Sequence, residues 1–279
     1  MTSNPARAPL FDEARLRRHR ALSQSFPNPT GFVLQKRLEE DLVHTVETLG
    51  LNASSLRRIL VWGARLDGLP QALTRLFPKA EIIIADTVPL FLNETLVSSH
   101  LYASENQITL DSGSVDLALS CLSLQTLNDP MSALQNYHRL LAAGGVFIAS
   151  FLGGQSLQHL HHTLLGLELS LNAGAHQRVI PMIDLSTALS LLQHAGFTEC
   201  VTDHNALSFS FTSLDDFRHF LKTLGLQAPL REMPPTSKPL YHLLKATSGL
   251  AERVVLDVIS MIGWKEKAGY PSLDVTLLP

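Results

Sequence analysis

The chain has 279 residues, of which 45% are hydrophobic and 17% charged, and its net charge is −3, which excludes a disordered chain. Its two cysteines, Cys121 and Cys200, match no disulfide framework and no metal-ligand spacing. The first 20 residues hold no apolar signal segment, and the longest apolar run, residues 146–152, is too short to cross a bilayer, so we expect a cytoplasmic protein with no transmembrane segment.

Two helices are expected at the N-terminus. Residues 10–22 have helical character, and the prolines that follow break the helix. Residues 32–50 repeat leucine or valine at helical spacing and end at a glycine, which predicts an amphipathic helix. Because Leu34, Leu38 and Leu42 need an apolar surface, we expect residues 1–50 to form a helical extension that covers the ligand cleft.

Seven basic side chains stand in the first 37 residues, against two acidic ones: Arg7, Arg15, Arg17, Arg18, Arg20, Lys36 and Arg37. Such an arm could bind nucleic acid, an anionic surface or an acidic partner. No aromatic or RNA-binding motif accompanies the charge, so we interpret it as a solvated helix face and expect no nucleic acid partner.

Strands and helices alternate from residue 58 onward, which is typical of a parallel sheet covered on both faces. Strands are expected at 58–63, 81–87, 115–125 and 144–153, and helices at 70–77 and 130–142. Further helices follow at 155–171, 184–194, 214–224 and 240–250, with a strand in the later part of 200–213 and a long final strand at 252–265.

The final strand lies far along the chain from its partners and fits an antiparallel edge hairpin added to the sheet. We therefore expect residues 51–279 to form one α/β domain, with a helical insertion at about 212–250.

In a doubly wound sheet, ligands bind beyond the carboxyl ends of the strands. Asp86 ends the second predicted strand, after the turn that contains Gly63 and Gly68. Its carboxylate could accept the two hydroxyls of a ribose, or it could simply cap the next turn.

Several blocks resemble class I S-adenosylmethionine-dependent methyltransferases: DSGSVDLALSCLSLQTLNDP, ALQNYHRLLAAGGVFIASFLGG and LLQHAGF. Within them, LSLQTLNDP, FIASFLGGQSL, MIGWK and the N-terminal FDEARLRRHRAL are similar to the complex I assembly factor five family, whose human members are regarded as arginine hydroxylases, and to its bacterial relatives. The biotin-pathway methyltransferase for malonyl carriers shares the FLGG-like block.

The resemblance implies a doubly wound, mostly parallel seven-stranded sheet with S-adenosylmethionine across the ends of its first, second and fourth strands. It implies methylation of a protein or a small molecule. Two alternatives stay open: a protein arginine hydroxylase that assists complex I assembly, and a non-catalytic binding protein with the same fold. A protein substrate or assembly partner fits the first two, and the residues identify no catalytic base and no acceptor.

The cofactor loop departs from the family pattern. Val61 stands at the usual acid position, Gly63 matches a glycine, and Arg65 replaces the next one. Arg65 and Asp67 could hold the carboxylate and the amino group of the cofactor, or Arg65 could obstruct the loop. We favour obstruction, because Ser104 also stands where an acid that faces adenine is expected.

The residues expected at the cofactor are Gly63, Arg65, Asp67, Gly68, Asp86, Ser104 and Leu122, the last two beside the base. Gln125 and Thr126 replace a His-Trp pair of the family. His159 and His162 could offer two metal ligands, but no acid or cysteine accompanies them, and we expect no metal. Gly153 and Gly154 either form a wall of the site or turn the chain. We expect Trp264 to serve packing alone.

Overall fold

The computed structural model describes residues 8–24, 29–90, 92–172, 174–225, 230–247 and 249–267. Seven strands form one sheet in the order β3-β2-β1-β4-β5-β7-β6. Their bounds are Arg58–Trp62 (β1), Glu81–Asp86 (β2), Ser99–Tyr102 (β3), Val115–Cys121 (β4), Leu141–Gly153 (β5), Thr198–Phe209 (β6) and Val254–Trp264 (β7). Only β7 pairs in the antiparallel sense, with β5 and with β6. The predicted doubly wound sheet is confirmed.

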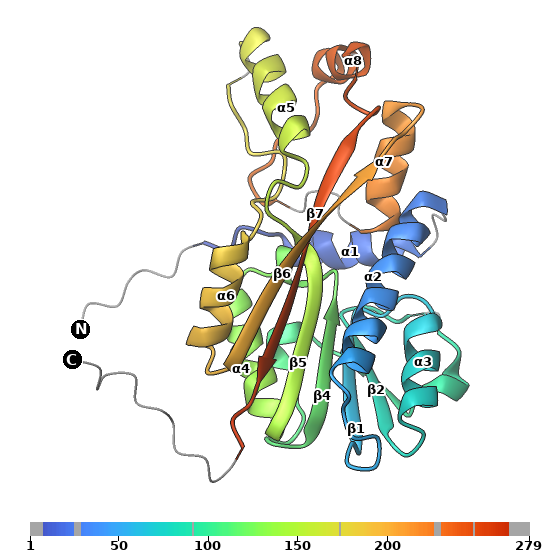
Figure 1. The fold of residues 1–279 in the computed structure, drawn as a ribbon. Coiled ribbons are helices and arrows are strands. Elements are labelled where there is room, and N and C mark those ends of the chain that lie inside the picture. The colour runs from blue at the N-terminus through green and yellow to red at the C-terminus, as the bar shows by residue number, and fades with distance from the viewer. Residues whose placement is uncertain are drawn as a thin grey trace, which may run out of the picture.

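The helices lie in layers on both faces of this sheet (Figure 1). Their bounds are Glu13–Ser23 (α1), Pro29–Thr48 (α2), Gly68–Leu76 (α3), Pro130–Leu140 (α4), Gln158–Ser170 (α5), Leu185–His194 (α6), Leu214–Thr223 (α7) and Lys238–Ala246 (α8). One core cluster packs α2, α3 and α7 against one face, and a second packs α4 and α6 against the other. Among the described residues, no helix is long and apolar enough to span a bilayer.

Two features of the sheet differ from the sequence prediction. The short strand β3 was not predicted, because its four residues are too few to show a periodic pattern. The predicted antiparallel pair at the edge, in contrast, is confirmed, since β7 and the edge strand β6 are antiparallel neighbours. The strand predicted at 115–125 ends at Cys121, because Leu122 takes a left-handed backbone conformation with φ of 49°.

The two N-terminal helices occupy different places. Leu34, Leu38 and Leu42 of α2 are fully buried in the core cluster shared with α3 and the sheet. The leucine face of this helix therefore packs on a flank of the domain, while its beginning lines a cavity through Gln35. Helix α1, in contrast, lies at the carboxyl ends of the parallel strands (Figure 1).

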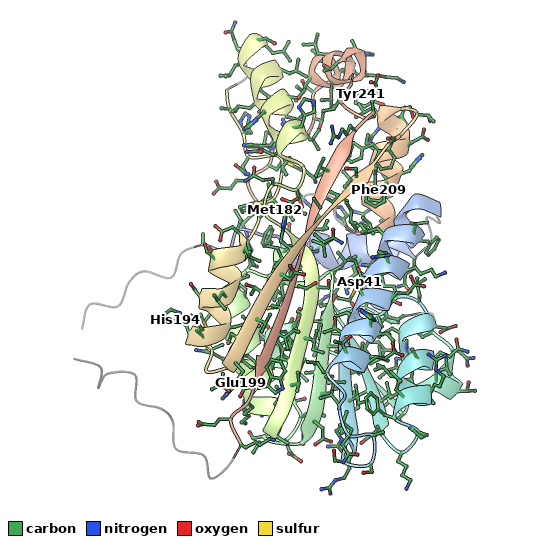
Figure 2. All side chains as sticks on the ribbon, viewed as in Figure 1. Asp41, Met182, His194, Glu199, Phe209 and Tyr241 are labelled. Atoms are coloured by element: carbon green, nitrogen blue, oxygen red, sulfur yellow. The ribbon has the colours of Figure 1, made fainter. Side chains whose placement is uncertain are left out.

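The helices α7 and α8 stand between β6 and β7 in the chain, within the predicted insertion. At the end of β6, Phe209 packs against Phe220 of α7 with ring centroids 5.4 Å apart (Figure 2). Helix α5 packs against α8 on the same end of the molecule. Trp264 is partly buried against the core, as expected.

The glycine pair after β5 is explained by packing. A Cβ on Gly153 would lie 2.4 Å from the carbonyl oxygen of Ile183, and one on Gly154 would lie 2.7 Å from a carboxylate oxygen of Asp257. Gly154 also has a φ of 55°. The pair therefore turns the chain where β7 passes close by, and it lines none of the cavity described below.

The burial of α2 predicts a large effect of truncation. We expect Leu38→Ala to lower the free energy of unfolding by about 2–5 kcal/mol, because the leucine is fully buried and leaves a cavity. Urea denaturation measures the change. Leu169→Ala is the matched control, because Leu169 is 58% exposed on α5 and should change stability by less than about 0.5 kcal/mol. Equal effects of the two substitutions would contradict the packing of α2.

Candidate functional site

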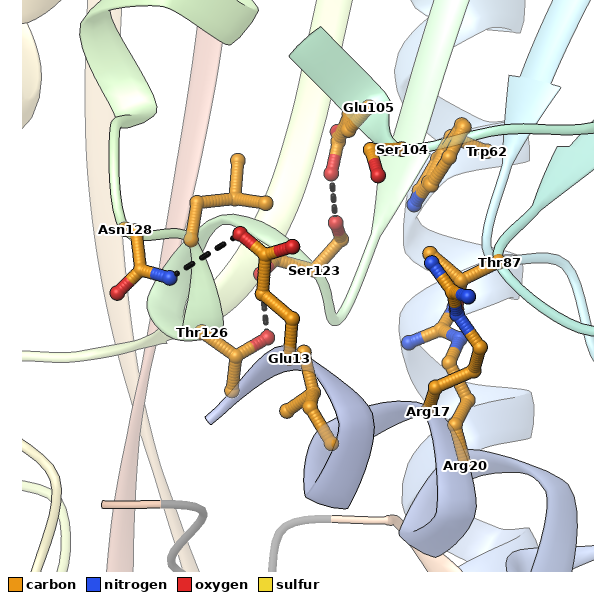
Figure 3. Close-up of a pocket in the computed structure, with 12 residues that line it drawn as sticks. Glu13, Arg17, Arg20, Trp62, Thr87, Ser104, Glu105, Ser123, Thr126 and Asn128 are labelled. Atoms are coloured by element: carbon orange, nitrogen blue, oxygen red, sulfur yellow. Dashed lines mark hydrogen bonds between the residues drawn. The ribbon is translucent and has the colours of Figure 1, made fainter. Parts of the chain in front are cut away.

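A small cavity lies at the carboxyl ends of the parallel strands (Figure 3). Its sheet side is formed by Trp62 at the end of β1, Thr87 after β2, Ser104 after β3 and Ser123 after β4. The opposite side is formed by α1. The cavity measures about 60 Å³, which is room for a few water molecules.

An ion pair joins α1 to the sheet at this cavity. Nε and Nη2 of Arg20 donate to the two carboxylate oxygens of Asp86 at 2.5 and 2.6 Å. Asp86 is 1% exposed, and its Oδ1 also accepts the backbone N–H of Thr87 at 2.7 Å. Burial lowers the pKa of Arg20, but the charge and hydrogen bonds of Asp86 outweigh this effect and raise it overall. Asp86 thus caps its own turn and binds a cation as well.

Arg20 is the functional residue that the sequence prediction missed. Its charge was interpreted as part of a solvated helix face, and for this residue that interpretation is wrong, since Arg20 is buried. Its neighbours Arg17 and Arg18 are exposed. Nothing in the local pattern separates the three arginines, because the partner of Arg20 lies 66 residues away in the chain.

In the loop after β1, Gly63 has a left-handed backbone conformation and also lies too close to its neighbours for a side chain. Gly63 has a φ of 78°, and a Cβ there would lie 2.4 Å from the carbonyl oxygen of Cys121 and 3.0 Å from Nη2 of Arg20. The glycine expected at the cofactor is therefore required by the close approach of β4 and of Arg20.

Arg65 lies beside the cleft and joins α1 to α7. Its Nη1 donates to Oγ of Ser23 at 2.9 Å and to the carbonyl oxygen of Thr223 at 3.1 Å. Burial, together with the nearby charge of Arg20, lowers the pKa of Arg65 to about 10. The cation that pairs with Asp86 is Arg20 and not Arg65. The obstruction by Arg65 stays a prediction.

A polar cluster supports this loop from α2. The backbone N–H of Arg65 donates to Oε1 of Glu39 at 3.0 Å, and Nε2 of Gln35 donates to the same oxygen at 2.6 Å. Oε2 of Glu39 and Oε1 of Gln35 are buried without a hydrogen-bond partner among the described residues. Burial raises the pKa of Glu39 to about 7, although these hydrogen bonds oppose the shift.

A second cavity of about 280 Å³ lies next to Arg65. Gln35 and Asp67 also line it. Asp67 is exposed, and its carboxylate accepts the backbone N–H of Asn93 at 2.8 Å. Gly68 is exposed at the start of α3, and a Cβ on it would meet nothing within 4 Å. The structure therefore shows no steric need for glycine at position 68.

The loop after β3 holds an acid one position beyond the expected one. Ser104 lines the small cavity, and next to it the carboxylate of Glu105 accepts the hydroxyls of Ser120 at 2.8 Å and Tyr137 at 2.6 Å. The hydroxyl of Ser123 donates to it as well. Burial raises the pKa of Glu105, and the three hydroxyls oppose that shift. Glu105 thus fixes the cavity wall.

Leu122, expected beside the base, directly follows β4. Its side chain belongs to the apolar core and does not line the small cavity. Its left-handed backbone turns the chain at the end of β4, and its N–H donates to the carbonyl oxygen of Ser150 at 2.8 Å. Thr126 does line the cavity, whereas both amide atoms of Gln125 are buried without a partner among the described residues.

The other candidate groups form no further site. Among the described residues, no group of three or more histidine, cysteine or acidic side chains could hold a metal ion, so His159 and His162 have no additional ligands. The thiol of Cys121 is fully buried, and burial raises its pKa far above the usual range, so it is no nucleophile.

Comparisons with known proteins agree with this architecture. Residues 69–149 match the methyltransferase domain family. The chain is 28% identical over 222 residues to a Rickettsia prowazekii protein named as a methyltransferase, covering 79% of this chain and 96% of that protein. It is 26% identical over 235 residues to the malonyl-[acyl-carrier protein] O-methyltransferase of Xylella fastidiosa, covering 81% and 76%. It is 25% identical over 174 residues to the mitochondrial arginine-hydroxylase NDUFAF5 of Danio rerio, covering 58% and 53%.

A solved structure shares the fold. A Bacillus halodurans crystal structure described as that of a methyltransferase superposes with a TM-score of 0.50 at 15% identity, covering 82% of this chain and 100% of that one. The predicted resemblance to the class I methyltransferases is confirmed, and the chain is methyltransferase-like in sequence and fold.

The raised pKa of Glu39 predicts a pH dependence of stability. The folded chain holds this proton up to about pH 7, whereas the unfolded chain releases it near pH 4.5. The free energy of unfolding should therefore fall as the pH rises from about 4.5 to 7, by about 3 kcal/mol from this group. Glu39→Gln keeps an acceptor for the N–H of Arg65 and should remove this part of the slope, measured by urea denaturation across that range. Identical slopes in the two proteins would contradict the shift.

Proposed function

We propose that the chain binds S-adenosylmethionine across the carboxyl ends of β1, β2 and β4 and transfers its methyl group to a protein or small-molecule acceptor. The observation that carries the proposal is Asp86, a buried carboxylate at the end of β2 that its own turn holds in place. A carboxylate at this position can accept both hydroxyls of a ribose. The similarity to methyltransferases of two bacteria supports the proposal.

The charges of the lining side chains suit the cofactor, but the volume of the small cavity does not. Beside the small cavity, the larger one is lined by Arg65 and Asp67, whose charges complement a carboxylate and an amino group. Arg20 lies between Asp86 and Gly63. Helix α1 lines both cavities, the small one through Arg20 and the larger one through Ser23. A small-molecule site measures about 300–1,000 Å³, and the 60 Å³ of the small cavity, where Arg20 covers Asp86, is too little. Binding therefore requires Arg20 to leave Asp86.

When bound, the cofactor supplies an activated methyl group. The roles proposed for this chain are to hold it and to exclude water. Asp86 would orient the ribose, and Arg65 would hold the carboxylate, because a guanidinium binds carboxylates with two parallel hydrogen bonds. Methyl transfer depends mainly on positioning the donor in line with the acceptor, so no fixed base is needed.

Two alternatives have specific support. The relatives include a protein named as a mitochondrial arginine-hydroxylase, which favours a protein side chain as the substrate, in the setting of complex I assembly. The occupied cleft favours a non-catalytic protein that keeps the fold for binding a partner. Titration with S-adenosylmethionine separates the last alternative from the others, because a non-catalytic protein with a filled cleft binds none.

The ribose contact predicts the effect of removing Asp86. We expect Asp86→Ala to weaken the binding of S-adenosylhomocysteine, the demethylated product, by about 1–3 kcal/mol, the scale of a lost hydrogen bond to a charged group. Titration calorimetry measures the affinity. Asp111→Ala is the control, because Asp111 is an exposed acid that precedes the amino end of β4, away from the carboxyl ends where the site lies. Because Asp86→Ala also releases Arg20, the loss is measured between Arg20→Ala and Arg20→Ala/Asp86→Ala. Equal affinities of these two variants would remove Asp86 from the site.

A further inference from the structure

We infer that α1 acts as an internal latch on the proposed cofactor site. Its Arg20, paired with Asp86, competes with the cofactor for that carboxylate. The inference rests on the proposed function and adds to it a regulation of the same site. In the latched state the guanidinium of Arg20 takes the position proposed for the ribose hydroxyls. Release of α1, which lines both cavities, would join them into one cleft.

Polar contacts, rather than apolar burial, hold α1 in the cleft. Its two buried residues are Arg20 and Ser23, and Leu22 between them is 43% exposed. A helix that is held by its core normally buries an apolar stripe. The half of α1 that carries Arg20 and Ser23 buries little apolar surface. If this half leaves the cleft, little apolar surface is therefore exposed to water.

Two polar contacts of the half of α1 that carries Arg20 and Ser23 are made with residues proposed to bind the cofactor. Arg20 binds Asp86, the proposed ribose acceptor, and Ser23 accepts a hydrogen bond from Arg65, the proposed carboxylate ligand. A bound cofactor would thus replace the two α1 contacts at its two ends. Competition of this kind needs no change elsewhere in the sheet.

The start of α1 is anchored separately. Phe11, just before the helix, is buried against Ile180 and Leu230, and its backbone N–H donates to Oδ1 of Asn128 at 2.7 Å. This anchor involves neither Asp86 nor Arg65. The end of α1 that carries Arg20 can therefore leave the cleft while the beginning of the segment stays attached.

Release of Arg20 leaves neither its guanidinium nor the carboxylate of Asp86 without a hydrogen-bond partner. Asp86 keeps the N–H of Thr87 and gains either water or the ribose, and the guanidinium becomes hydrated. A buried ion pair contributes little net stability, because desolvation offsets most of its attraction. The latched state is therefore one that a ligand can displace, and its population raises the apparent dissociation constant of the cofactor.

The test compares two arginines of the same helix. We expect Arg20→Ala to bind S-adenosylhomocysteine about tenfold more tightly than the wild type in titration calorimetry, as for a latch that closes about nine molecules in ten. Arg18→Ala is the matched control, because Arg18 is exposed on α1, and it should bind as the wild type does. Hydrogen exchange of the wild-type protein should show faster exchange in residues 13–23 once the nucleoside is added, which tests the latch without any substitution.

The outcomes separate the latch from the proposed function. Asp86→Ala opens the latch and removes the ribose contact together, so the contact alone is measured by comparing Arg20→Ala with the double variant Arg20→Ala/Asp86→Ala. If the double variant binds the nucleoside more weakly than Arg20→Ala, and Arg20→Ala binds no more tightly than the wild type, the latch proposal is wrong and the proposed cofactor site is supported. If neither the wild type nor Arg20→Ala binds the nucleoside, the proposed function fails and the latch falls with it.

Discussion

The contact between Arg20 and Asp86 determines what the cleft can hold. It places the guanidinium of α1 against the carboxylate at the end of β2. Doubly wound sheets bind ligands beyond these carboxyl ends of their strands. The size of the cavity follows from it, since α1 forms the side opposite the sheet. The position of Arg65 follows too, because Ser23 of the same helix receives its hydrogen bond.

A buried layer beneath the loop after β1 gives this arrangement its rigidity. Glu39 on α2 accepts the backbone N–H of Arg65 and a hydrogen bond from Gln35, while Gly63 lies against the carbonyl oxygen of Cys121. The loop is therefore fixed from below by side chains of α2 and from the side by the neighbouring strand. The absence of the usual glycines does not leave it loose. Its shape is set by hydrogen bonds to a carboxyl group rather than by a glycine-rich backbone.

Much of the fold could be predicted because it rests on local patterns. The apolar strands β1, β2, β4 and β5 and the periodic leucines of α2 follow from spacing alone. The site could be predicted only in part. Gly63, Asp86 and Ser104 lie at or just after the carboxyl ends of β1, β2 and β3, as counting along the chain predicts, and the buried acid Glu105 follows Ser104. The role of Arg20 depends on a partner distant in the chain, and no local pattern contains that information.

The place of β7 in the sheet bears on how the chain completes its fold during synthesis. In the sheet, β6 is hydrogen-bonded to β7 alone, and β7 also pairs with the far side of β5. Until residues 254–264 emerge, the long edges of β5 and β6 have no neighbour. Unpaired edges of this length invite association with other chains. Strand β7 therefore joins β6 to the sheet, and a nascent chain arrested before it would leave one edge of β5 and both edges of β6 unpaired.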